Sequence, residues 1–468
     1  MDQICCIILA AGLGKRLGGD LPKAIAETRE GTLIDLVLEG LRPLKPAKTI
    51  IVAGHKRELL EKHLKGNPRA AGHSIEFVYQ EEQLGTGHAV RCALPALSSF
   101  KGTVVLTYAD HPLFRPETLE HFVSYHSFKK ATLSMISFAA PPPHSYGRIV
   151  RGAKGEVLRI TEAKDCSPEE LLIQEANSGV YAVDSSFLKP AIESLKNTNA
   201  QKEYYLTDIV EKATGEGQSV FAFPLGDATE AAGVNTLHDL AFVNRVLEQR
   251  HIKRLVDSGV RFVDTESCGI DAGVTIAPGA LIGPQVQLRG STSIGAGAIV
   301  EGSSLLINAI VDARAQIKLG SRIEDATVGE DATVGPFANV RPGSKLGAHA
   351  RVGNFVELKN AILANGAKAS HLTYLGDCVV GEETNIGAGT ITCNYDGYNK
   401  SKTTIGKGVF IGSNSSLVAP VTIGDGALVA AGSVITRDIP ADALGLGRAR
   451  QENKDQWAKR RRELLEKK

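Results

Sequence analysis

Two groups of polar residues in this chain of 468 residues have types and spacings that could do chemistry. The first follows the apolar run Ile4–Leu9 and reads Ala10-Ala11-Gly12-Leu13-Gly14-Lys15-Arg16, with Leu21-Pro22-Lys23 one loop later. Glycines let a backbone approach a polyphosphate and offer it N–H groups, and Arg16 and Lys23 would neutralise its charge. A Gly-x-Gly pair alone is often only a turn, but the preceding strand and the Pro-Lys favour a nucleotide-binding loop. No Gly-Lys-[Ser/Thr] closes it, which excludes a Walker loop.

The second group surrounds His371. A lone histidine is more often structural than catalytic, but this one lies in a stretch rich in other polar residues: Arg341, Glu357, Lys359, Tyr374, Asn385, Asn394 and Tyr395. Transfer of an acyl group from a thioester to an amine needs a base near neutral pH, and an imidazole suits that role. The second group could therefore supply the base of such a transfer.

A six-residue repeat must position the second group. It runs from about Ile270 to Ile435, with an aliphatic residue, often a Gly next, and a small residue four positions on, as in Val328-Gly-Glu-Asp-Ala332 and Ile411-Gly-Ser-Asn-Ser415. Three units close one triangular coil around the aliphatic residues, and stacked coils form a solenoid. The hexapeptide form is a left-handed parallel β-helix, an exception to the usual right-handed crossover.

The repeat is interrupted twice. His371 and Tyr374 lie in a stretch that breaks it, and a longer loop, roughly Thr392–Thr404, interrupts it again. Breaks in a solenoid are where functional residues are usually attached. The interruptions therefore predict the position of a site on the β-helix.

An α/β domain must position the first group. Short aliphatic strands at Ile4–Leu9, Thr49–Val52 and Val104–Thr107 alternate with helical stretches at Thr32–Leu44 and Glu58–Leu64. This alternation predicts a Rossmann-like, mainly parallel sheet, with ligands at the carboxyl ends of its strands. Leucines and valines at helical spacing predict a linking helix over 236–258. We expect domains at 1–235 and 261–440, a linker at 236–260 and a tail at 441–468.

Composition excludes several classes of protein. The formal net charge of +1 gives no general case for binding nucleic acid or a membrane surface. The 7 cysteines include no Cys-x-x-Cys, so we expect reduced thiols in a cytoplasmic protein. The apolar run Ile4–Ala11 is too short to span a bilayer, and we expect no integral membrane association. The basic end, Lys459–Lys468, suggests either a nucleic-acid or membrane contact or a solvated tail, and blocks of like charge favour the tail.

The first-half motifs resemble the sugar-nucleotidyltransferase (pyrophosphorylase) family. After the glycine loop and Lys23, the family's residues follow in order at Gln80, Gln83–His88, Tyr108-Ala109-Asp110, Tyr146-Gly147-Arg148, Glu162, Asn177 and Gly233-Val234-Asn235. With Asn354–Lys359, His371–Gly376 and Asn385–Gly397, nearly the whole chain is similar to bacterial bifunctional enzymes. Those enzymes acetylate glucosamine 1-phosphate from acetyl-CoA and then transfer uridylyl from UTP to N-acetylglucosamine 1-phosphate, releasing pyrophosphate.

The resemblance implies roles in the first half. Arg16 and Lys23 would be catalytic, stabilising charge on the transferring phosphoryl group, and Asp110 and Asn235 would hold Mg²⁺. The nucleotide site would comprise Leu9, Ala10, Ala11, Gly12, Lys23, Gln80, Gly85 and Thr86, and the sugar-phosphate site Tyr108, Asp110, Gly147, Glu162, Asn177 and Asn235. Taken alone, Glu162 is more typical of a surface residue and Asn177 of a turn residue, whereas a carboxylate at a strand end favours a metal ligand.

The resemblance also implies roles in the second half. His371 would be the base, oriented by Glu357. Glucosamine 1-phosphate would be bound by Arg341, Lys359, Tyr374, Asn385 and Lys400, and acetyl-CoA by Ala388, Asn394, Tyr395, Ser413, Ala431 and Arg448. Taken alone, Ala388 and Ala431 are the small residues that any coil requires. Related β-helices form homotrimers with sites shared between neighbours, and a closed cyclic assembly would bury the flat faces.

Some residues depart from the family pattern. Lys15 replaces a usual Thr and Leu17 a frequent Met, while Ala109, Ser145 and Ala430 each replace a Gly. Neither Lys15 nor Ala109 removes a charged or metal-binding group, so these two changes bear on rate and nucleotide choice, and Ala430 lies beside Ala431 of the expected acetyl-CoA groove. Two other interpretations stay open. One is a single-activity nucleotidyltransferase with a non-catalytic β-helix, and the other is a binding scaffold without activity; neither needs His371 or Asn394-Tyr395-Asp396-Gly397.

Overall fold

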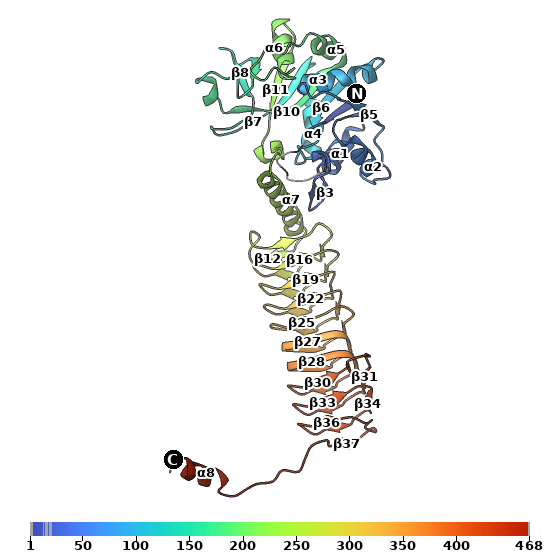
Figure 1. Cartoon of the computed structure of the whole chain (residues 1–468). Helices are drawn as coiled ribbons and strands as arrows, with labels where there is room; N and C mark the ends of the chain where they lie inside the picture. Colours follow the sequence, from blue (N-terminus) through green and yellow to red (C-terminus); the bar gives the residue numbers. More distant parts are fainter. Residues whose placement is uncertain (1–2, 13, 15–16, 18–20, 467–468) are drawn as a thin grey trace. The chain divides into compact units, whose positions relative to one another are not determined.

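The computed structural model describes residues 3–12, 14, 17 and 21–466, and the chain divides into two compact units, Met1–Leu247 and Glu248–Lys468. Figure 1 labels their helices and strands. The helix expected over 236–258 is α7, Leu237–Asp257. Its Val243 and Leu247 belong to a core cluster of the first unit, and its Ile252 and Leu255 to the core of the second. Each unit therefore has its own core.

The first unit contains a mainly parallel sheet, as expected. Its strand order is β11-β7-β10-β6-β1-β4-β5, and β10 is antiparallel to both of its neighbours. An antiparallel pair, β8 and β9, is attached at β10. The strands are β1 (Ile4–Ala10), β4 (Lys48–Ala53), β5 (Ile75–Tyr79), β6 (Thr103–Tyr108), β7 (Leu133–Ala139), β8 (Arg148–Arg151), β9 (Val157–Thr161), β10 (Glu175–Asp184) and β11 (Val220–Pro224), beside a small hairpin of β2 (Glu27–Thr28) and β3 (Gly31–Thr32).

Helices cover both faces of this sheet. Every residue of β1 is buried, which is why its sequence is a continuous apolar run. Its alternate side chains enter different cores: Cys6 and Ile8 pack with residues of α1, α2 and α4, and Cys5 and Ile7 with residues of α3, α5 and α6. The helices are α1 (Leu33–Leu41), α2 (Arg57–Leu64), α3 (Thr86–Ala93), α4 (Pro116–Phe128), α5 (Ser185–Glu193) and α6 (Asp208–Gly215).

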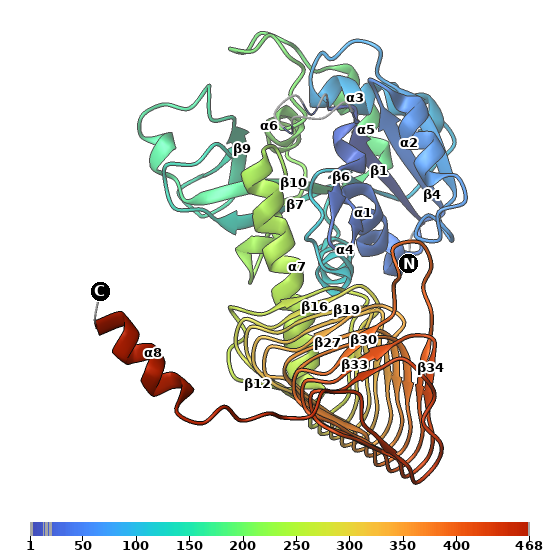
Figure 2. The same ribbon diagram turned by 60° about the horizontal axis from the view of Figure 1, so that its bottom comes forward.

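The second unit is the left-handed parallel β-helix that the repeat predicts. Residues 261–445 contribute 26 strands, from β12 (Arg261–Phe262) to β37 (Leu444–Gly445), and strands three apart pair in parallel, as β12 does with β15 (Leu281–Ile282). Aliphatic residues of successive coils stack into fully buried columns, such as Ile282, Val300, Ile317 and Val334. Figure 2 shows the coils superimposed. A core one side chain wide explains why the period is strict.

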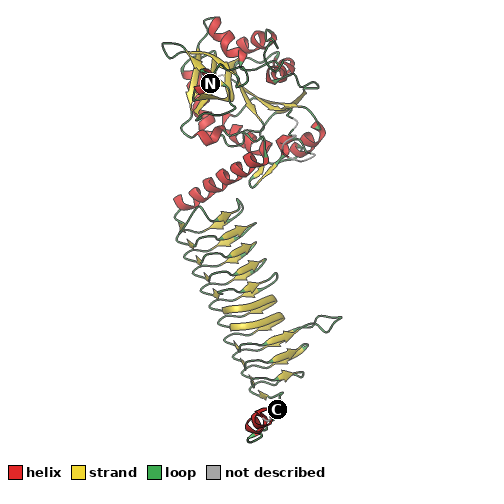
Figure 3. Cartoon of the chain, turned by 60° about the vertical axis from the view of Figure 1, so that its left-hand side comes forward, coloured by secondary structure: helices red, strands yellow, loops and turns green. Residues whose placement is uncertain are grey.

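The expected interruptions are visible in the β-helix. Most strands have two or three residues, but β27 (Arg351–Leu363) and β28 (Lys368–Val380) each run for 13 residues and pair along their length. They are the two long adjacent strands in Figure 3. The predicted loop lies between β30 (Ile391–Cys393) and β31 (Thr403–Ile405). His371 and Tyr374 are both on β28.

The segment after Ile439-Pro440 contains more structure than a polar tail. It begins with β37 and ends in α8 (Trp457–Glu466), whose side chains are all exposed. The sequence did not predict α8, because its few apolar residues make no helical stripe that a core would require; its Arg, Lys, Glu and Leu are good helix formers. Within the described residues, no helix is both long enough and apolar enough to cross a membrane.

Candidate active sites

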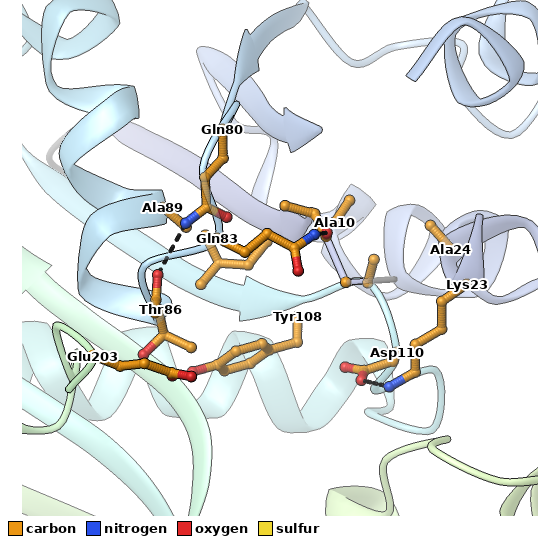
Figure 4. A pocket seen from close by; sticks show the side chains of 15 residues that line it. Ala10, Lys23, Ala24, Gln80, Gln83, Thr86, Ala89, Tyr108, Asp110 and Glu203 are labelled. Carbon is orange, nitrogen blue, oxygen red and sulfur yellow. Dashed lines mark hydrogen bonds and ion pairs between the residues drawn. The ribbon is translucent and has the colours of Figure 1, made fainter. Parts of the chain in front are cut away.

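A cavity of about 300 Å³ lies at the carboxyl ends of β1, β5 and β6, where the α/β alternation predicts a ligand. Figure 4 shows the side chains that line it. Ten of the residues predicted for nucleotide or sugar phosphate line this one cavity: Leu9, Ala10, Ala11, Gly12, Lys23, Gln80, Gly85, Thr86, Tyr108 and Asp110. Arg16, predicted to be catalytic, and Lys15 lie outside the described residues. The cavity also has the substituted Ala109 in its lining, whereas Ser145 is exposed elsewhere.

The loop before α3 is fastened to the rest of the cavity by side chains predicted to contact the nucleotide. Gln80 Nε2 donates to the carbonyl of Gly85 (3.0 Å), and Gln83 Nε2 donates to the carbonyl of Ala11 (2.7 Å). Gly85 has φ +105°, and a Cβ on it would lie 2.7 Å from the carbonyl oxygen of Tyr204. Only glycine satisfies both the backbone conformation and this close approach.

We expect Gly85→Ala to lower nucleotidyl transfer about tenfold or more, because strained backbone alone costs about 1–3 kcal/mol. The measurement is pyrophosphate release at varied UTP concentration. Gly72→Ala is the matched control: Gly72 has φ +88°, but a Cβ on it would have nothing within 4 Å. Wild-type kinetics in Gly85→Ala would contradict a role for this loop in the nucleotide site.

Lys23, Asp110 and Asn235 come together from three distant segments. Lys23 opens a 3-10 turn (Lys23–Ile25), Asp110 follows β6, and the amide of Val234 donates to the Asp110 carbonyl (2.9 Å), which places Asn235 alongside. The ammonium of Lys23 forms an ion pair with the Asp110 carboxylate and donates to Asn235 Oδ1 (2.7 Å). The two oxygens predicted to hold a metal therefore converge on one cation.

This donor set fits a hard divalent cation. A carboxylate and an amide oxygen directed at one point are ligands that Mg²⁺ accepts, and Mg²⁺ usually takes only one or two protein carboxylates with substrate phosphates completing its shell. In the described part of the chain, no group of three or more His, Cys, Asp or Glu suited to a metal occurs. In the structure the ammonium of Lys23 lies at this position.

Three of the residues predicted for the sugar-phosphate site, Gly147, Glu162 and Asn177, lie together, with Asn177 on β10. The amide of Asn177 donates to the Gly147 carbonyl (2.9 Å), and a Cβ on Gly147 would be 3.6 Å from the Glu162 carboxylate. Burial raises the pKa of Glu162, and Thr207 Oγ1 donates to its carboxylate (3.1 Å). The side chain of Asn177 bonds within β10, to Tyr181 and the amide of Gly179. Its contact with a sugar stays a prediction.

Glu203 is a cavity residue that the sequence did not indicate. It lies more than 90 residues after the other polar lining groups and reaches the site because the amide of Tyr204 donates to the Leu84 carbonyl (2.8 Å). No local pattern marks a carboxylate whose position depends on such a tertiary contact.

In the β-helix, β27 and β28 place His371 beside Asn354. The two residues are paired in the strand register, and His371 Nδ1 lies 3.2 Å from Asn354 Oδ1. Glu357, predicted to orient His371, is instead paired in register with Tyr374, and its carboxylate accepts a hydrogen bond from Arg341 Nη1 (2.7 Å). The sequence missed Asn354, although it belongs to the same short motif as Glu357.

A second group on the same coils combines positive charges with amides. Lys400 lies beside Lys359, and its ammonium holds the pKa of Lys359 below the ordinary value. Two ammonium groups this close favour an anion such as a sugar phosphate. Asp377 lies next to them and accepts from Asn360 Nδ2 (2.7 Å) and from Asn394 Nδ2. Burial tends to raise the pKa of Asp377, but these hydrogen bonds and the charges of Lys359 and Lys400 together lower it below the ordinary value.

The residues predicted for acetyl-CoA follow one another on successive coils. The Ala388 carbonyl accepts from the amide of Asn414 (2.7 Å), and the Ser413 carbonyl from the amide of Gly432 (2.8 Å), next to Ala431. A Cβ on Gly432 would be 4.0 Å from the Arg448 side chain. Of the remaining predicted residues, Tyr395 and Lys400 form an isolated antiparallel β-bridge through their backbones in the loop between β30 and β31. Asn385 lies on β29 (Asn385–Ile386).

Two domain families match the two units. Residues 6–167 match the MobA-like NTP transferase domain, and residues 325–360 and 402–437 match the bacterial transferase hexapeptide repeats. Proteins called bifunctional protein GlmU are similar over nearly the whole chain. The protein from Pelobacter propionicus is 43% identical over 457 residues, 98% of each chain. The protein from Streptococcus suis is 43% identical over 460 residues, 98% of each chain, and that from Geobacter sulfurreducens 42% over 480 residues, 99% of this chain and 100% of its own. The chain belongs to the GlmU family.

Membership of the GlmU family agrees with the two-unit architecture. The MobA-like match covers β1 to β9 and with them nearly all of the cavity lining. The hexapeptide matches leave residues 361–401 between them. That interval contains His371, Asp377, Asn394 and Lys400, whereas Arg341, Asn354, Glu357 and Lys359 lie within the first match. The polar groups of this GlmU family member therefore lie partly in the repeat and partly where the β-helix departs from it.

Proposed function

We propose that this chain makes UDP-N-acetylglucosamine in two reactions: acetyl transfer from acetyl-CoA to glucosamine 1-phosphate, then uridylyl transfer from UTP to N-acetylglucosamine 1-phosphate. We assign the second reaction to residues 1–235 and the first to 261–440, with 236–260 linking them and 441–468 as a tail. The observation that carries the proposal is the presence of two separate polar sites in one chain that bifunctional GlmU proteins match from end to end.

Uridylyl transfer uses the cavity of the first unit. An oxygen of the sugar 1-phosphate attacks the α-phosphorus of UTP, and pyrophosphate leaves. Lys23 stabilises the charge that develops on the phosphoryl group, Gln80 and the Gly85-Thr86 backbone hold the base, and Asp110 with Asn235 would hold a divalent cation. A bound cation supplies charge neutralisation and polarises the phosphoryl oxygens. We propose Mg²⁺ because both protein ligands are oxygens.

Acetyl transfer uses the polar residues of the β-helix. The 2-amine of glucosamine 1-phosphate attacks the thioester carbon, the C–S bond breaks, and His371 takes the proton that the nitrogen loses. Arg341, Lys359 and Lys400 supply positive charge for the sugar phosphate. The column formed by Ala388, Ser413 and Ala431 would line the groove for acetyl-CoA, with Arg448 approaching its phosphates.

Assembly and location are further parts of the proposal. Phe337 and Phe355 both have positive φ, stack on each other (5.9 Å between ring centroids) and are both exposed, so the β-helix carries apolar surface at this position that a homotrimer would cover. All seven cysteines are free thiols, which supports a reducing, cytoplasmic location. The single-activity alternative, in which the β-helix only serves assembly, is not favoured because it leaves His371 and the lysine pair without a use.

Base selection tests the first half of the proposal. We expect UTP to give a higher kcat/KM than ATP, GTP or dTTP, because Gln80 and the loop from Gln83 to His88 match the uridine-binding pattern and are held rigidly in the cavity. The measurement is pyrophosphate release with N-acetylglucosamine 1-phosphate and each of the four triphosphates. Equal kcat/KM for UTP and dTTP would show that Ala109 and Lys15 permit broader selection.

A further inference from the structure

We propose that Asn354 is a positioning residue that holds His371 in the tautomer protonated at Nδ1, so that Nε2 carries the lone pair that accepts the proton of the amine. The inference rests on the proposed acetyl transfer, and it assigns to Asn354 the orienting role that the sequence had suggested for Glu357. The Asn354 side chain would touch His371 rather than the substrate.

The contact itself defines the tautomer. Asn354 Oδ1 lies 3.2 Å from His371 Nδ1, within hydrogen-bond distance. A carbonyl oxygen can only accept, so the hydrogen must be on Nδ1 of the ring. In a neutral imidazole only one nitrogen is protonated, which leaves Nε2 free to act as the base. One amide oxygen therefore selects which end of the ring does the chemistry.

The backbone holds these two side chains next to each other. Asn354 and His371 are register partners on β27 and β28, and a Cβ on the preceding Gly353 would lie 1.8 Å from the carbonyl oxygen of Ser370. No other residue at 353 permits this approach of the two coils. A left-handed residue follows each partner, Phe355 with φ 55° and Leu372 with φ 33°. A Leu with positive φ is strained, which is a common property of functional sites.

The charged side chains near His371 on β27 and β28 contact groups other than the His371 ring. On β27, Glu357 is bound to Arg341, and Lys359 lies beside Lys400. On β28, Lys368 Nζ lies 3.9 Å from Glu383 Oε2. Tyr374 is the register partner of Glu357, and on the next coil the backbone after His371 pairs with Gly389, beside the uncharged Ala388. The group that contacts the His371 ring is therefore a neutral amide.

A neutral partner has a chemical consequence. A carboxylate at Nδ1 would stabilise the imidazolium, so the ring would stay protonated up to a higher pH. A protonated ring cannot act as a base. An amide fixes the ring without that penalty. During the reaction the nitrogen–hydrogen bond of the amine breaks as the nitrogen–carbon bond forms, its proton moves to Nε2, and the C–S electron pair leaves with CoA as a thiolate, which can recover the proton.

Asn354→Asp is the most informative variant, because it keeps an acceptor oxygen and adds a charge. We expect the acidic limb of its kcat/KM profile for CoA release to move to higher pH by about one unit or more, with kcat near the wild-type value above that limb. Asn354→Ala removes the acceptor, and we expect its kcat to fall roughly tenfold to a hundredfold at every pH. If Asn354 were purely structural, both substitutions would lower the rate of CoA release alike, and the acidic limb would stay at the wild-type pH.

Asn365→Asp is the matched control. Asn365 Oδ1 accepts from the amide of Ala348 (2.9 Å), a bond that Asp also makes, and it lies between the same two strands. We expect its pH profile to match the wild type. The assignment would be overturned if the acidic limb did not shift in Asn354→Asp, or if it shifted equally in Asn365→Asp. It would also be overturned if Glu357→Gln were the one variant with a shifted limb. Wild-type protein that releases no CoA would instead refute acetyl transfer, and the assignment with it.

Discussion

His371→Asn is expected to lose acetyl transfer by about 100- to 10,000-fold, the usual worth of a positioned general base. An amide cannot take the proton that the 2-amine of glucosamine 1-phosphate loses as it attacks acetyl-CoA. The measurement is release of free CoA in the presence of glucosamine 1-phosphate. The same variant should still convert N-acetylglucosamine 1-phosphate and UTP to the nucleotide sugar, because the contacts among Lys23, Asp110 and Asn235 lie in the other unit.

His349→Asn is the control for this result. His349 is a histidine at another corner of the β-helix, with φ 60°, a conformation that Asn tolerates well. We expect it to release CoA at the wild-type rate. If His371→Asn also does so, His371 is a structural histidine and the base must be another group.

Asp110→Asn is expected to show the opposite pattern. It removes the carboxylate that, with Asn235, would hold the divalent cation, and it breaks the ion pair with Lys23. Loss of one preorganised electrostatic group typically costs about 100- to 1000-fold in kcat, so we expect pyrophosphate release to fall at least that far. Release of CoA from acetyl-CoA and glucosamine 1-phosphate should continue at the wild-type rate.

The retained activity is the internal control for Asp110→Asn. A folded protein that loses both activities would mean that the two reactions share a site, contrary to the assignment of each to its own unit. Undiminished pyrophosphate release would remove Asp110 from the metal site. Raising the divalent cation concentration should partly restore the variant if the loss lies in cation binding, since weaker binding is compensated by mass action.

The sequence predicted those features that local rules control. The six-residue period follows from a core one side chain wide, and the all-buried β1 follows from helices on both faces, so both units could be inferred. The lining of the cavity could be named because Gly85, Gln80 and Asp110 follow strands whose ends meet. Asn177 shows the limit: its position was predicted, but its side chain bonds within β10.

The features that were missed depend on contacts between distant segments. Glu203 joins the cavity through a backbone bond of Tyr204 to Leu84. The partner of His371 depends on how many residues each coil contains: a separation of 17 pairs it with Asn354, and Glu357 falls opposite Tyr374. A motif that contains both Asn354 and Glu357 cannot decide between them without this register.

A single incubation shows whether one chain performs both reactions in sequence. Purified protein is incubated with acetyl-CoA labelled in the acetyl group, glucosamine 1-phosphate, UTP and Mg²⁺, and the nucleotide sugar is isolated. We expect the label to appear in UDP-N-acetylglucosamine, with one CoA and one pyrophosphate released for each molecule formed. Label that stays in acetyl-CoA, while a parallel incubation still converts unlabelled N-acetylglucosamine 1-phosphate and UTP to the nucleotide sugar, would contradict the proposed acetyl transfer and leave a single-activity nucleotidyltransferase.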